Sequence, residues 1–376
     1  MEPSVPLTDY LYQKSGAGRI PLSGTFELSP VCNLSCRMCY VRKTAREVQA
    51  SPRPILTLEQ WLDIARQARE AGMLFLLLTG GEPLAWPDFW TLYEELIAMG
   101  FLININTNGV LIDEAASQRF RRLPPKRINV TLYGAGNETY RALCGEEVFD
   151  QVDRGIRLLQ KAGVNVKLNS SFTPWNVRDM EKILAYAKDL GIPLQTTAYM
   201  LPPVRRRPDL VGQNDRLTPE EAARCRIRYH QLQTDPESHR AYLEGILRGW
   251  TQPPVLEEGC LDPLDGHIRC RAGSAAFWIT WDGWMTPCGM MNEPKADLST
   301  GDFSRCWKEI TEHCATMRLS GLCGQCANQT LCHPCAAVAA AETGTPGGIP
   351  AYLCSMALHM RRIAEEELEK LRREGT

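Results

Sequence analysis

The sequence predicts an α/β fold, a partial (β/α)6 TIM-like barrel followed by a small cysteine-rich domain. Three observations predict it. From Gly24 to about residue 199, short apolar runs alternate with longer amphipathic runs, as they do in parallel β/α folds. Four of the amphipathic runs stop at a glycine, which is typical of helix ends. Ten of the 15 cysteines lie between Cys260 and Cys354, where the alternation has ended.

Six apolar runs are predicted strands, at residues 25–29, 73–79, 101–106, 128–133, 164–170 and 194–199. Helices are predicted between them, at residues 57–71, 88–99, 148–162 and 177–190. The first helix opens with Thr57-Leu-Glu-Gln, which has the pattern of a capping box. Serial β/α units predict a parallel sheet that curls into a partial barrel, with functional residues at the carboxyl ends of its strands.

We expect five segments: an extension (1–23), the barrel (24–200), a helical bridge (201–255), the cysteine-rich domain (256–360) and a charged helix (361–376). The bridge follows a proline-rich break and is predicted to hold helices at 219–233 and 237–250. The cysteine-rich domain is expected to fold around metal rather than a large apolar core. We expect the charged helix to be exposed to solvent.

Composition and charge exclude several classes of protein. With 42 basic and 44 acidic residues the formal net charge is −2, so nucleic-acid binding is not expected. The longest apolar runs are too short to span a membrane, and the first residues have no secretory pattern. We therefore expect a cytoplasmic protein, because clustered thiols in a reducing compartment more often hold metal than form disulfides.

Three of the cysteines lie close together directly after the first predicted strand. Cys32, Cys36 and Cys39 form a C-x3-C-x2-C pattern. Three thiolates at this spacing suit three irons of a [4Fe–4S] cluster and leave the fourth iron open. A structural zinc site is the alternative, but zinc requires four ligands and no histidine lies in this stretch.

A second motif, Gly80-Gly81-Glu82-Pro83, closes the second predicted strand. Together with the three cysteines it resembles the radical S-adenosylmethionine (SAM) superfamily. The resemblance implies a partial barrel whose [4Fe–4S] cluster binds SAM and cleaves it to a 5′-deoxyadenosyl radical. It also implies that Glu82 accepts a hydrogen bond from the methionyl ammonium group of SAM and that the glycines let the backbone approach the ligand.

Further polar residues at strand ends match the superfamily in position. The resemblance implies that they serve the SAM carboxylate and ribose, although each is also an ordinary turn residue. They are Asn106, Asn108, Thr131, Asn169 and Ser171. The superfamily usually has an aromatic residue just before the third cysteine. Here Met38 stands there, so its thioether is expected against the adenine.

The C-terminal cysteines resemble a SPASM domain, which many radical SAM enzymes carry. The resemblance implies two auxiliary [4Fe–4S] clusters, one on Cys323, Cys326, Cys332 and Cys354, the other on Cys270, Cys288 and Cys335 with Cys260 as its candidate fourth ligand. A zinc ribbon is the alternative, but the two C-x2-C pairs are too close together for one. Four other cysteines can instead serve as small buried hydrophobic residues. They are Cys144, Cys225, Cys306 and Cys314.

SPASM proteins mostly modify peptides or proteins. We therefore expect a peptide or protein substrate, a low-potential electron donor such as flavodoxin or ferredoxin, and an oxidative outcome such as a thioether or carbon–carbon crosslink or a dehydrogenation. Sulfatase maturases have an aspartate after the cysteine matched to Cys288, whereas this chain has Gly289. Only 23 residues precede Gly24, so a leader peptide is expected to need a separate carrier or to bind the protein directly.

Three alternatives stay open. A radical epimerase would use Cys144 as its hydrogen-atom donor. A radical SAM enzyme that modifies a small molecule is the second, and a non-catalytic iron–sulfur electron-transfer protein is the third. The run Arg205-Arg206-Arg207 follows the sixth strand and is either a contact for an acidic peptide or a solvated loop.

Overall fold

The computed structural model describes residues 6–248, 270–333 and 335–373. Cys260, the end of the second bridge helix and the expected boundary at residues 255 and 256 lie outside the described residues. In the described part of the chain, no helix combines the length and the apolar character needed to cross a membrane.

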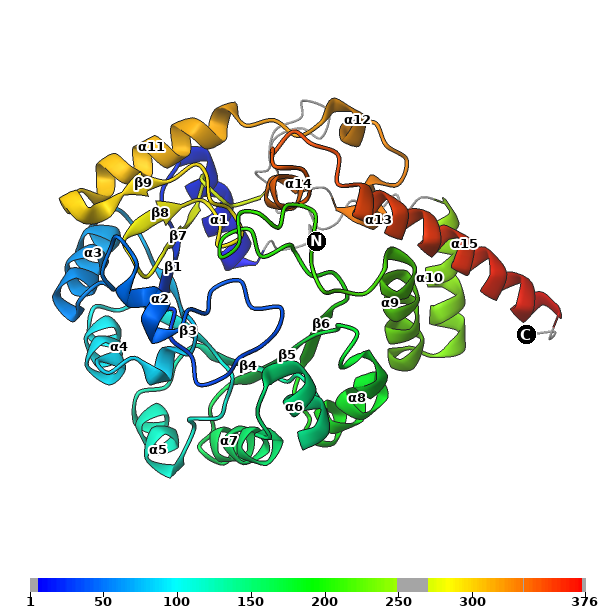
Figure 1. Ribbon diagram of the computed structural model, residues 1–376, viewed down its shortest axis with the longest axis horizontal. Helices are drawn as coiled ribbons and strands as arrows, with labels where there is room; N and C mark the ends of the chain where they lie inside the picture. Colours follow the sequence, from blue (N-terminus) through cyan, green and yellow to red (C-terminus); the bar gives the residue numbers. More distant parts are fainter. Residues whose placement is uncertain (1–5, 249–269, 334, 374–376) are drawn as a thin grey trace.

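The core of the fold is a parallel sheet wrapped by helices, which confirms the predicted fold class (Figure 1). Its first six strands lie within two residues of the predicted positions: β1 (Ser23–Glu27), β2 (Phe75–Thr79), β3 (Leu102–Thr107), β4 (Arg127–Thr131), β5 (Val166–Ser171) and β6 (Leu194–Thr197). Each pairs in parallel with the next. Their carboxyl ends therefore meet at one edge of the sheet.

Helices on the outer side connect these strands (Figure 1). They are α3 (Leu58–Glu70), α4 (Phe89–Ala98), α5 (Glu114–Arg122), α6 (Asn137–Cys144), α7 (Phe149–Lys161) and α8 (Met180–Asp189). The capping box at Thr57 is present. Gly72, Gly100, Gly163 and Gly191 all have positive φ, as predicted for glycines that end helices. The sequence analysis did not anticipate α5 and α6.

The sheet continues past β1 into the C-terminal region. β7 (Ala276–Ile279) pairs in parallel with β1, and β8 (Trp284–Thr286) and β9 (Ala296–Asp297) follow in antiparallel order. α11 (Phe303–Thr316) covers them, and Phe277, Met285 and Phe303 are buried. The expectation that this region lacks an apolar core is therefore wrong for residues 276–316, because the open edge of β1 supplies a surface for an apolar hairpin to extend.

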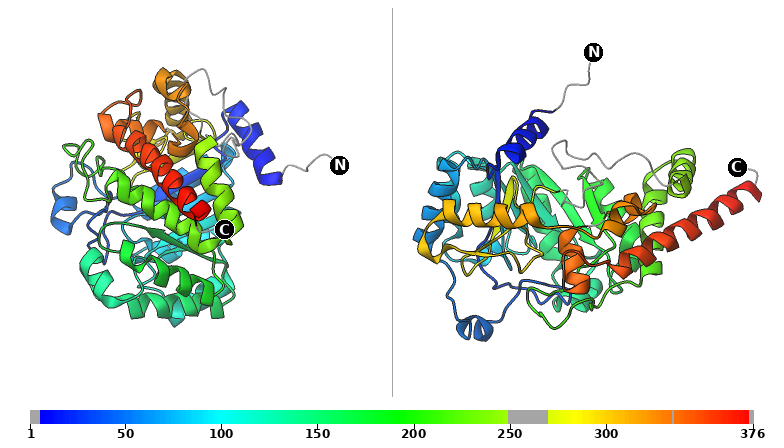
Figure 2. Two further views of the ribbon diagram at one scale, coloured as in Figure 1. Left: turned by 90° about the vertical axis from the view of Figure 1, so that its right-hand side faces the viewer. Right: turned by 90° about the horizontal axis from the view of Figure 1, so that it is seen from above.

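The bridge helices α9 (Pro219–Gln233) and α10 (Pro236–Arg248) pack against the long C-terminal helix α15 (Ala351–Arg373), as both views in Figure 2 show. Residues 353, 356, 360, 363 and 368 of α15 are buried, a spacing that places them on one helix face. The expectation of a solvent-exposed helix is therefore wrong for this face, whereas most of the charged residues after 360 are exposed. α15 also runs unbroken through residue 360, where a domain boundary was expected.

The remaining elements, apart from the 12-residue α1, are short. They are α1 (Leu7–Gly18), α2 (Ala45–Gln49), α12 (Gly321–Gly324), α13 (Gln329–Cys332), α14 (Ala336–Thr343) and the 3-10 turns η1 (Pro83–Ala85), η2 (Val177–Asp179) and η3 (Leu298–Thr300). In Figure 1, α12 to α14 lie between α11 and α15.

Candidate functional site

A pocket of about 220 Å³ lies at the carboxyl ends of β2 to β5, under the loop that follows β1. Its walls include ten of the residues predicted from sequence: Cys32, Cys36, Met38, Cys39, Gly80, Gly81, Asn106, Asn108, Thr131 and Ser171. Glu82, Pro83 and Asn169 lie beside it rather than in its walls. The parallel register explains the grouping, since the ends of neighbouring strands lie side by side.

The loop that carries the three cysteines is fixed by hydrogen bonds to sulfur. Cys32 Sγ accepts from the backbone N–H of Leu34 at 3.4 Å and from the Asn108 amide at 3.7 Å. Cys39 Sγ accepts from the Arg42 N–H at 3.2 Å. Burial raises the pKa of the Cys32 thiol to about 12 and also raises that of Cys39. These hydrogen bonds oppose that effect and favour the thiolate that a metal would take.

These thiols fit an iron–sulfur cluster better than a single ion. Among residues 6–248, 270–333 and 335–373, no group of three His, Cys, Asp or Glu side chains is arranged to hold one metal ion. Zinc would need its sulfur ligands at about 2.3 Å from one centre. A [4Fe–4S] cluster instead takes one thiolate on each iron, so its ligands can stand further apart around one pocket.

The chain itself requires glycine at positions 80 and 81. A Cβ at Gly80 would lie 2.6 Å from the carbonyl oxygen of Ser29, and one at Gly81 would lie 2.3 Å from that of Val31. The Gly81 N–H donates to the Ser29 carbonyl at 2.7 Å. The sequence analysis assigned these glycines to the approach of a ligand. The structure adds a reason, which is that the ends of β1 and β2 are packed backbone to backbone beside Cys32.

The Glu82 carboxylate is fully buried and joins two strand ends. Its Oε1 accepts from the Leu84 N–H at 3.2 Å and the Thr107 hydroxyl at 2.8 Å, and its Oε2 accepts from the Asn108 N–H at 2.8 Å. Burial raises the pKa of Glu82 to about 7, although these hydrogen bonds act in the opposite direction. Glu82 therefore holds Asn108 at the pocket, and its role toward an ammonium group stays a prediction.

Cys144 lies at the end of α6 and is fully buried. Its backbone carbonyl accepts from the Ser35 N–H at 2.9 Å, and the residue does not line the pocket. Tyr133 does line the pocket, beside Cys36. The structure thus places Cys144 behind the loop of the three cysteines and outside the pocket. Sequence reasoning missed Tyr133, although it stands at the end of the fourth predicted strand.

The C-terminal cysteines fall into two groups in space. Burial, together with charge on the neighbouring thiols of Cys354, Cys326 and Cys323, raises the pKa of Cys332 to about 12. Burial likewise raises the pKa of Cys288, to which charge on Cys335 adds. These groups match the two predicted ligand sets in part. Cys270 is exposed, and cluster ligation by any of these residues stays a prediction.

A buried ion pair lies where the barrel meets the C-terminal region. Arg205 donates to both Glu27 carboxylate oxygens, at 2.9 and 3.0 Å, and to the Gly289 carbonyl at 2.8 Å. The Trp278 Nε1–H donates to Glu27 at 2.9 Å. Arg205 is thus buried with its donors bound to Glu27 and Gly289, and it is not a surface contact for an acidic peptide. Arg207 pairs with Asp209 at the surface.

Gly289 has no room for a side chain. A Cβ there would lie 2.7 Å from the ring of Trp278, which is itself hydrogen-bonded to Glu27. An aspartate after Cys288 would therefore displace this ring. The packing gives a physical reason for the glycine that the sequence analysis noted at this position.

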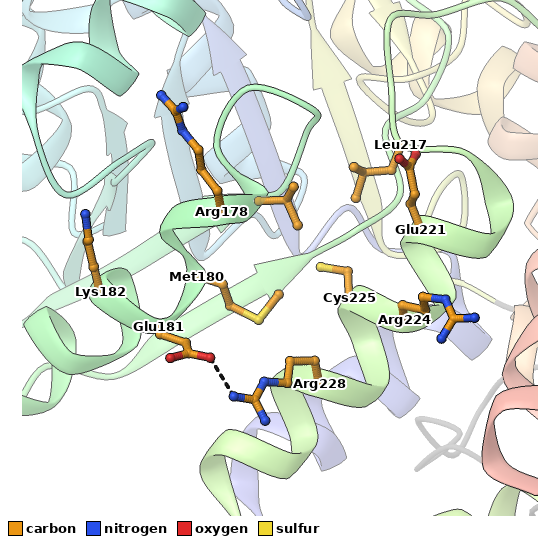
Figure 3. Close-up of a pocket in the computed structure, with 10 residues that line it drawn as sticks. Arg178, Met180, Glu181, Lys182, Leu217, Glu221, Arg224, Cys225 and Arg228 are labelled. Carbon is orange, nitrogen blue, oxygen red and sulfur yellow. Dashed lines mark hydrogen bonds and ion pairs between the residues drawn. The ribbon is translucent and has the colours of Figure 1, made fainter. Parts of the chain in front are cut away.

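A second cavity, of about 440 Å³, lies between α8 and α9 on the outer side of the barrel (Figure 3). Its apolar residues include Met180, Leu217 and Cys225, and Arg228 pairs with Glu181 at 2.5 Å across it. It contains none of the predicted site residues. The pocket at the strand ends is therefore the candidate functional site.

One family model matches a part of the chain. The profile of the Radical SAM superfamily matches residues 26–187. This range covers the strands and loops that form the pocket.

Two curated relatives align with most of the chain. An AdoMet-dependent heme synthase of Methanosarcina barkeri is 24% identical over 85% of this chain and 92% of its own. The mycofactocin maturase MftC of Mycobacterium tuberculosis is 26% identical over 87% of this chain and 81% of its own.

Two solved structures share the fold. The structure of native anSMEcpe with bound AdoMet has a TM-score of 0.67 at 18% identity and covers 95% of this chain and 100% of its own. The structure of Streptococcus suis SuiB bound to the precursor peptide SuiA has a TM-score of 0.66 at 17% identity and covers 92% of this chain and 79% of its own. At these identities the likeness concerns the fold alone.

Proposed function

We propose that the protein is a radical SAM enzyme that reductively cleaves SAM and abstracts a hydrogen atom from a peptide or protein. The match of the Radical SAM superfamily profile to residues 26–187 supports this proposal. The observation that carries the proposal is the composition of one pocket. Three cysteines of a single loop share it with Gly80, Gly81 and the polar ends of β3 to β5. An electron carrier would not need the last two features.

We assign the cluster to Cys32, Cys36 and Cys39, which all line the pocket. When bound, the cluster and SAM supply a 5′-deoxyadenosyl radical, which is the chemistry of the cofactors rather than of the protein. The chain binds and orients them. Asn106, Thr131 and Ser171 offer polar side chains toward the carboxylate and ribose of SAM, and the buried Met38 offers its thioether toward the adenine.

The proposal of a peptide substrate is supported by two of the similar proteins. One is called a maturase, and the other was solved with a precursor peptide. Cys144 lies behind the cluster loop, so we do not assign it as the hydrogen-atom donor of an epimerase. The electron donor is proposed to be a low-potential protein such as flavodoxin or ferredoxin, and any leader-binding carrier is proposed to be a separate chain.

We further propose that the C-terminal cysteines hold two auxiliary [4Fe–4S] clusters. The proximity of Cys323, Cys326, Cys332 and Cys354 supports the first, and that of Cys288 and Cys335 supports part of the second. Such clusters would accept an electron after hydrogen abstraction. They therefore favour an oxidative product, either a crosslink or a dehydrogenated residue.

The test is anaerobic co-expression with short peptides encoded beside the gene, followed by mass spectrometry. An oxidative modification lowers the peptide mass by two hydrogens for each bond formed. We expect that loss with the wild-type protein and no change with Cys32, Cys36 and Cys39 all replaced by Ala. A peptide of unchanged mass, with a tetrapyrrole or other small molecule converted instead, would favour the second candidate. The heme synthase relative, aligned over 85% of this chain, supports that candidate.

A further inference from the structure

One residue of the pocket at the strand ends carries a charge that the proposed function does not use. Arg42 stands three positions after Cys39 in the sequence and lines the pocket. Among the described residues that line it, Arg42 is the only lysine, arginine, aspartate or glutamate. The other walls are thiols, apolar side chains, glycines, hydroxyls and amides. The guanidinium charge of Arg42 therefore has no carboxylate opposite it in these walls.

The half-buried side chain of Arg42 lacks the partners that a guanidinium group usually has. Its Nε is shielded from solvent and has no hydrogen-bond partner in residues 6–248, 270–333 and 335–373. Arg37, on the same loop, differs, because its Nε donates to the Ala142 carbonyl at 2.9 Å. Buried polar groups in native proteins are nearly always hydrogen-bonded. The unsatisfied Nε of Arg42 therefore indicates that an anion completes this side of the pocket.

Arg42 lies on the side of the pocket where the barrel is open. β1 and β6 stand at opposite ends of the six parallel strands and do not pair with each other. The Arg205 guanidinium lies over the ring of Tyr40, 5.7 Å from its centre. Arg206 Nη2 lies 3.9 Å from Oε1 of Glu47. The segment that follows the three cysteines therefore faces the segment that follows β6.

The side chains proposed for SAM come from other strands. Asn106, Thr131 and Ser171 belong to β3, β4 and β5. Arg42 and Met200, which follow β1 and β6, line the same pocket and border the part of it that is left for a substrate. A guanidinium matches a planar carboxylate with two parallel hydrogen bonds. In a peptide substrate, a carboxylate is thus the group that fits Arg42.

We propose that Arg42 is a specificity-determining residue that binds a carboxylate of the substrate, from either an acidic side chain or the C-terminus of the peptide. This inference rests on the proposed function, because it requires a peptide in the pocket. It also moves the contact for an acidic peptide away from Arg205, whose guanidinium is paired with Glu27, to the loop of the three cysteines.

The test measures peptide affinity on anaerobically reconstituted holoprotein in the presence of SAM. The probes are the peptides encoded beside the gene, synthesised in three forms. The first has all its carboxyl groups, the second has only the C-terminus amidated, and the third also has Asn and Gln in place of Asp and Glu. The form at which the wild type loses affinity identifies which carboxylate is bound.

The variants are compared on the same three peptide forms. We expect Arg42→Met to bind the first form about tenfold to a hundredfold more weakly than the wild type, and the third form equally well. Arg42→Lys keeps the charge but not the two parallel donors, and its affinity should lie between. Arg46→Met is the matched control, because Arg46 lies four residues later on α2, is exposed and is outside the pocket.

Equal affinities of the wild type and Arg42→Met for the first form would overturn the inference and leave the proposed function in place. Weaker SAM binding by Arg42→Met with unchanged peptide affinity would also overturn it, because the guanidinium would then serve the SAM carboxylate. If Arg42→Met loads less iron, the wild type decides, and equal affinity for all three forms overturns the inference. A wild type that neither binds nor modifies these peptides would overturn the proposed peptide substrate and this inference with it.

Discussion

The two cysteine-rich regions of this protein are held in different ways. The loop of Cys32, Cys36 and Cys39 lies between strand ends and α6, and the Cys32 sulfur and the loop backbone are hydrogen-bonded to the barrel. Cys323, Cys326 and Cys332 instead lie on or beside α12 and α13, which have four residues each. Helices this short are not stable on their own. The barrel therefore positions its cysteines through its own hydrogen bonds, whereas we expect residues 321–333 to depend on metal for order.

The largest expected effect comes from removing the three cysteines of the barrel loop. With Cys32, Cys36 and Cys39 replaced by Ala, we expect iron to fall from about twelve to about eight atoms per chain, since one of three [4Fe–4S] clusters is lost. The fold and the EPR signals of the auxiliary clusters should persist. Iron analysis and EPR measure this, with Cys225→Ala as control. Loss of all iron would show that the two regions are not independent.

Removing a C-terminal cysteine should affect the C-terminal region and leave the cluster of the barrel in place. Cys326→Ala is expected to lose one auxiliary cluster and to become sensitive to limited proteolysis near residues 321–335, because a segment that folds around metal loosens without it. Product formation should collapse. A soluble Cys326→Ala protein without that cluster that still modified substrate at the wild-type rate would instead make the C-terminal cysteines a structural support alone.

Substitution of Arg205 in the buried ion pair tests how strongly the barrel and the C-terminal region are joined. Arg205→Met leaves the Glu27 carboxylate buried without its partner, and breaking such a pair costs about 3–5 kcal/mol. We expect a large drop in thermal midpoint, seen by scanning fluorimetry. Arg207→Met is the matched control, because Arg207 and its partner Asp209 are exposed and solvent screens such a pair. Equal thermal midpoints for the two variants would show that the buried ion pair does not stabilise the protein.

The smallest expected effect concerns the pH dependence of Glu82. Its pKa is raised from 4.5 to about 7, so the buried carboxyl favours the protonated form and the folded state loses stability as the pH rises. Between pH 5.5 and 8 this loss amounts to about 2 kcal/mol relative to a residue that does not titrate. The midpoint of the wild type should therefore fall relative to that of Glu82→Gln over this range. Parallel pH profiles for the two proteins would show that the raised pKa is wrong.

Local patterns made most of the barrel predictable. The alternation of apolar and amphipathic runs located β1 to β6, and a glycine marked the end of each predicted helix. The motif at residues 80–83 and the three cysteines were placed at strand ends because parallel strands end at one edge. These features depend on neighbours in sequence, which a single chain displays directly.

The rest depended on contacts between distant segments. β7 has only four residues, and its place is set by the open edge of β1. Glu27 and Arg205 are 178 positions apart in the sequence. Nothing in the sequence around either residue indicates that the two form an ion pair. The apolar residues of α15 were taken for a sparse stripe on an exposed helix because α9 and α10, which cover them, are not adjacent in sequence.

The most direct test of the central claim is the amount of 5′-deoxyadenosine that the reconstituted protein releases from SAM under a strong reductant. The account predicts release by the wild type and by Cys326→Ala, and none by the protein with Cys32, Cys36 and Cys39 replaced by Ala. Absence of 5′-deoxyadenosine from the fully reconstituted wild type, or equal release by the triple variant, would contradict it.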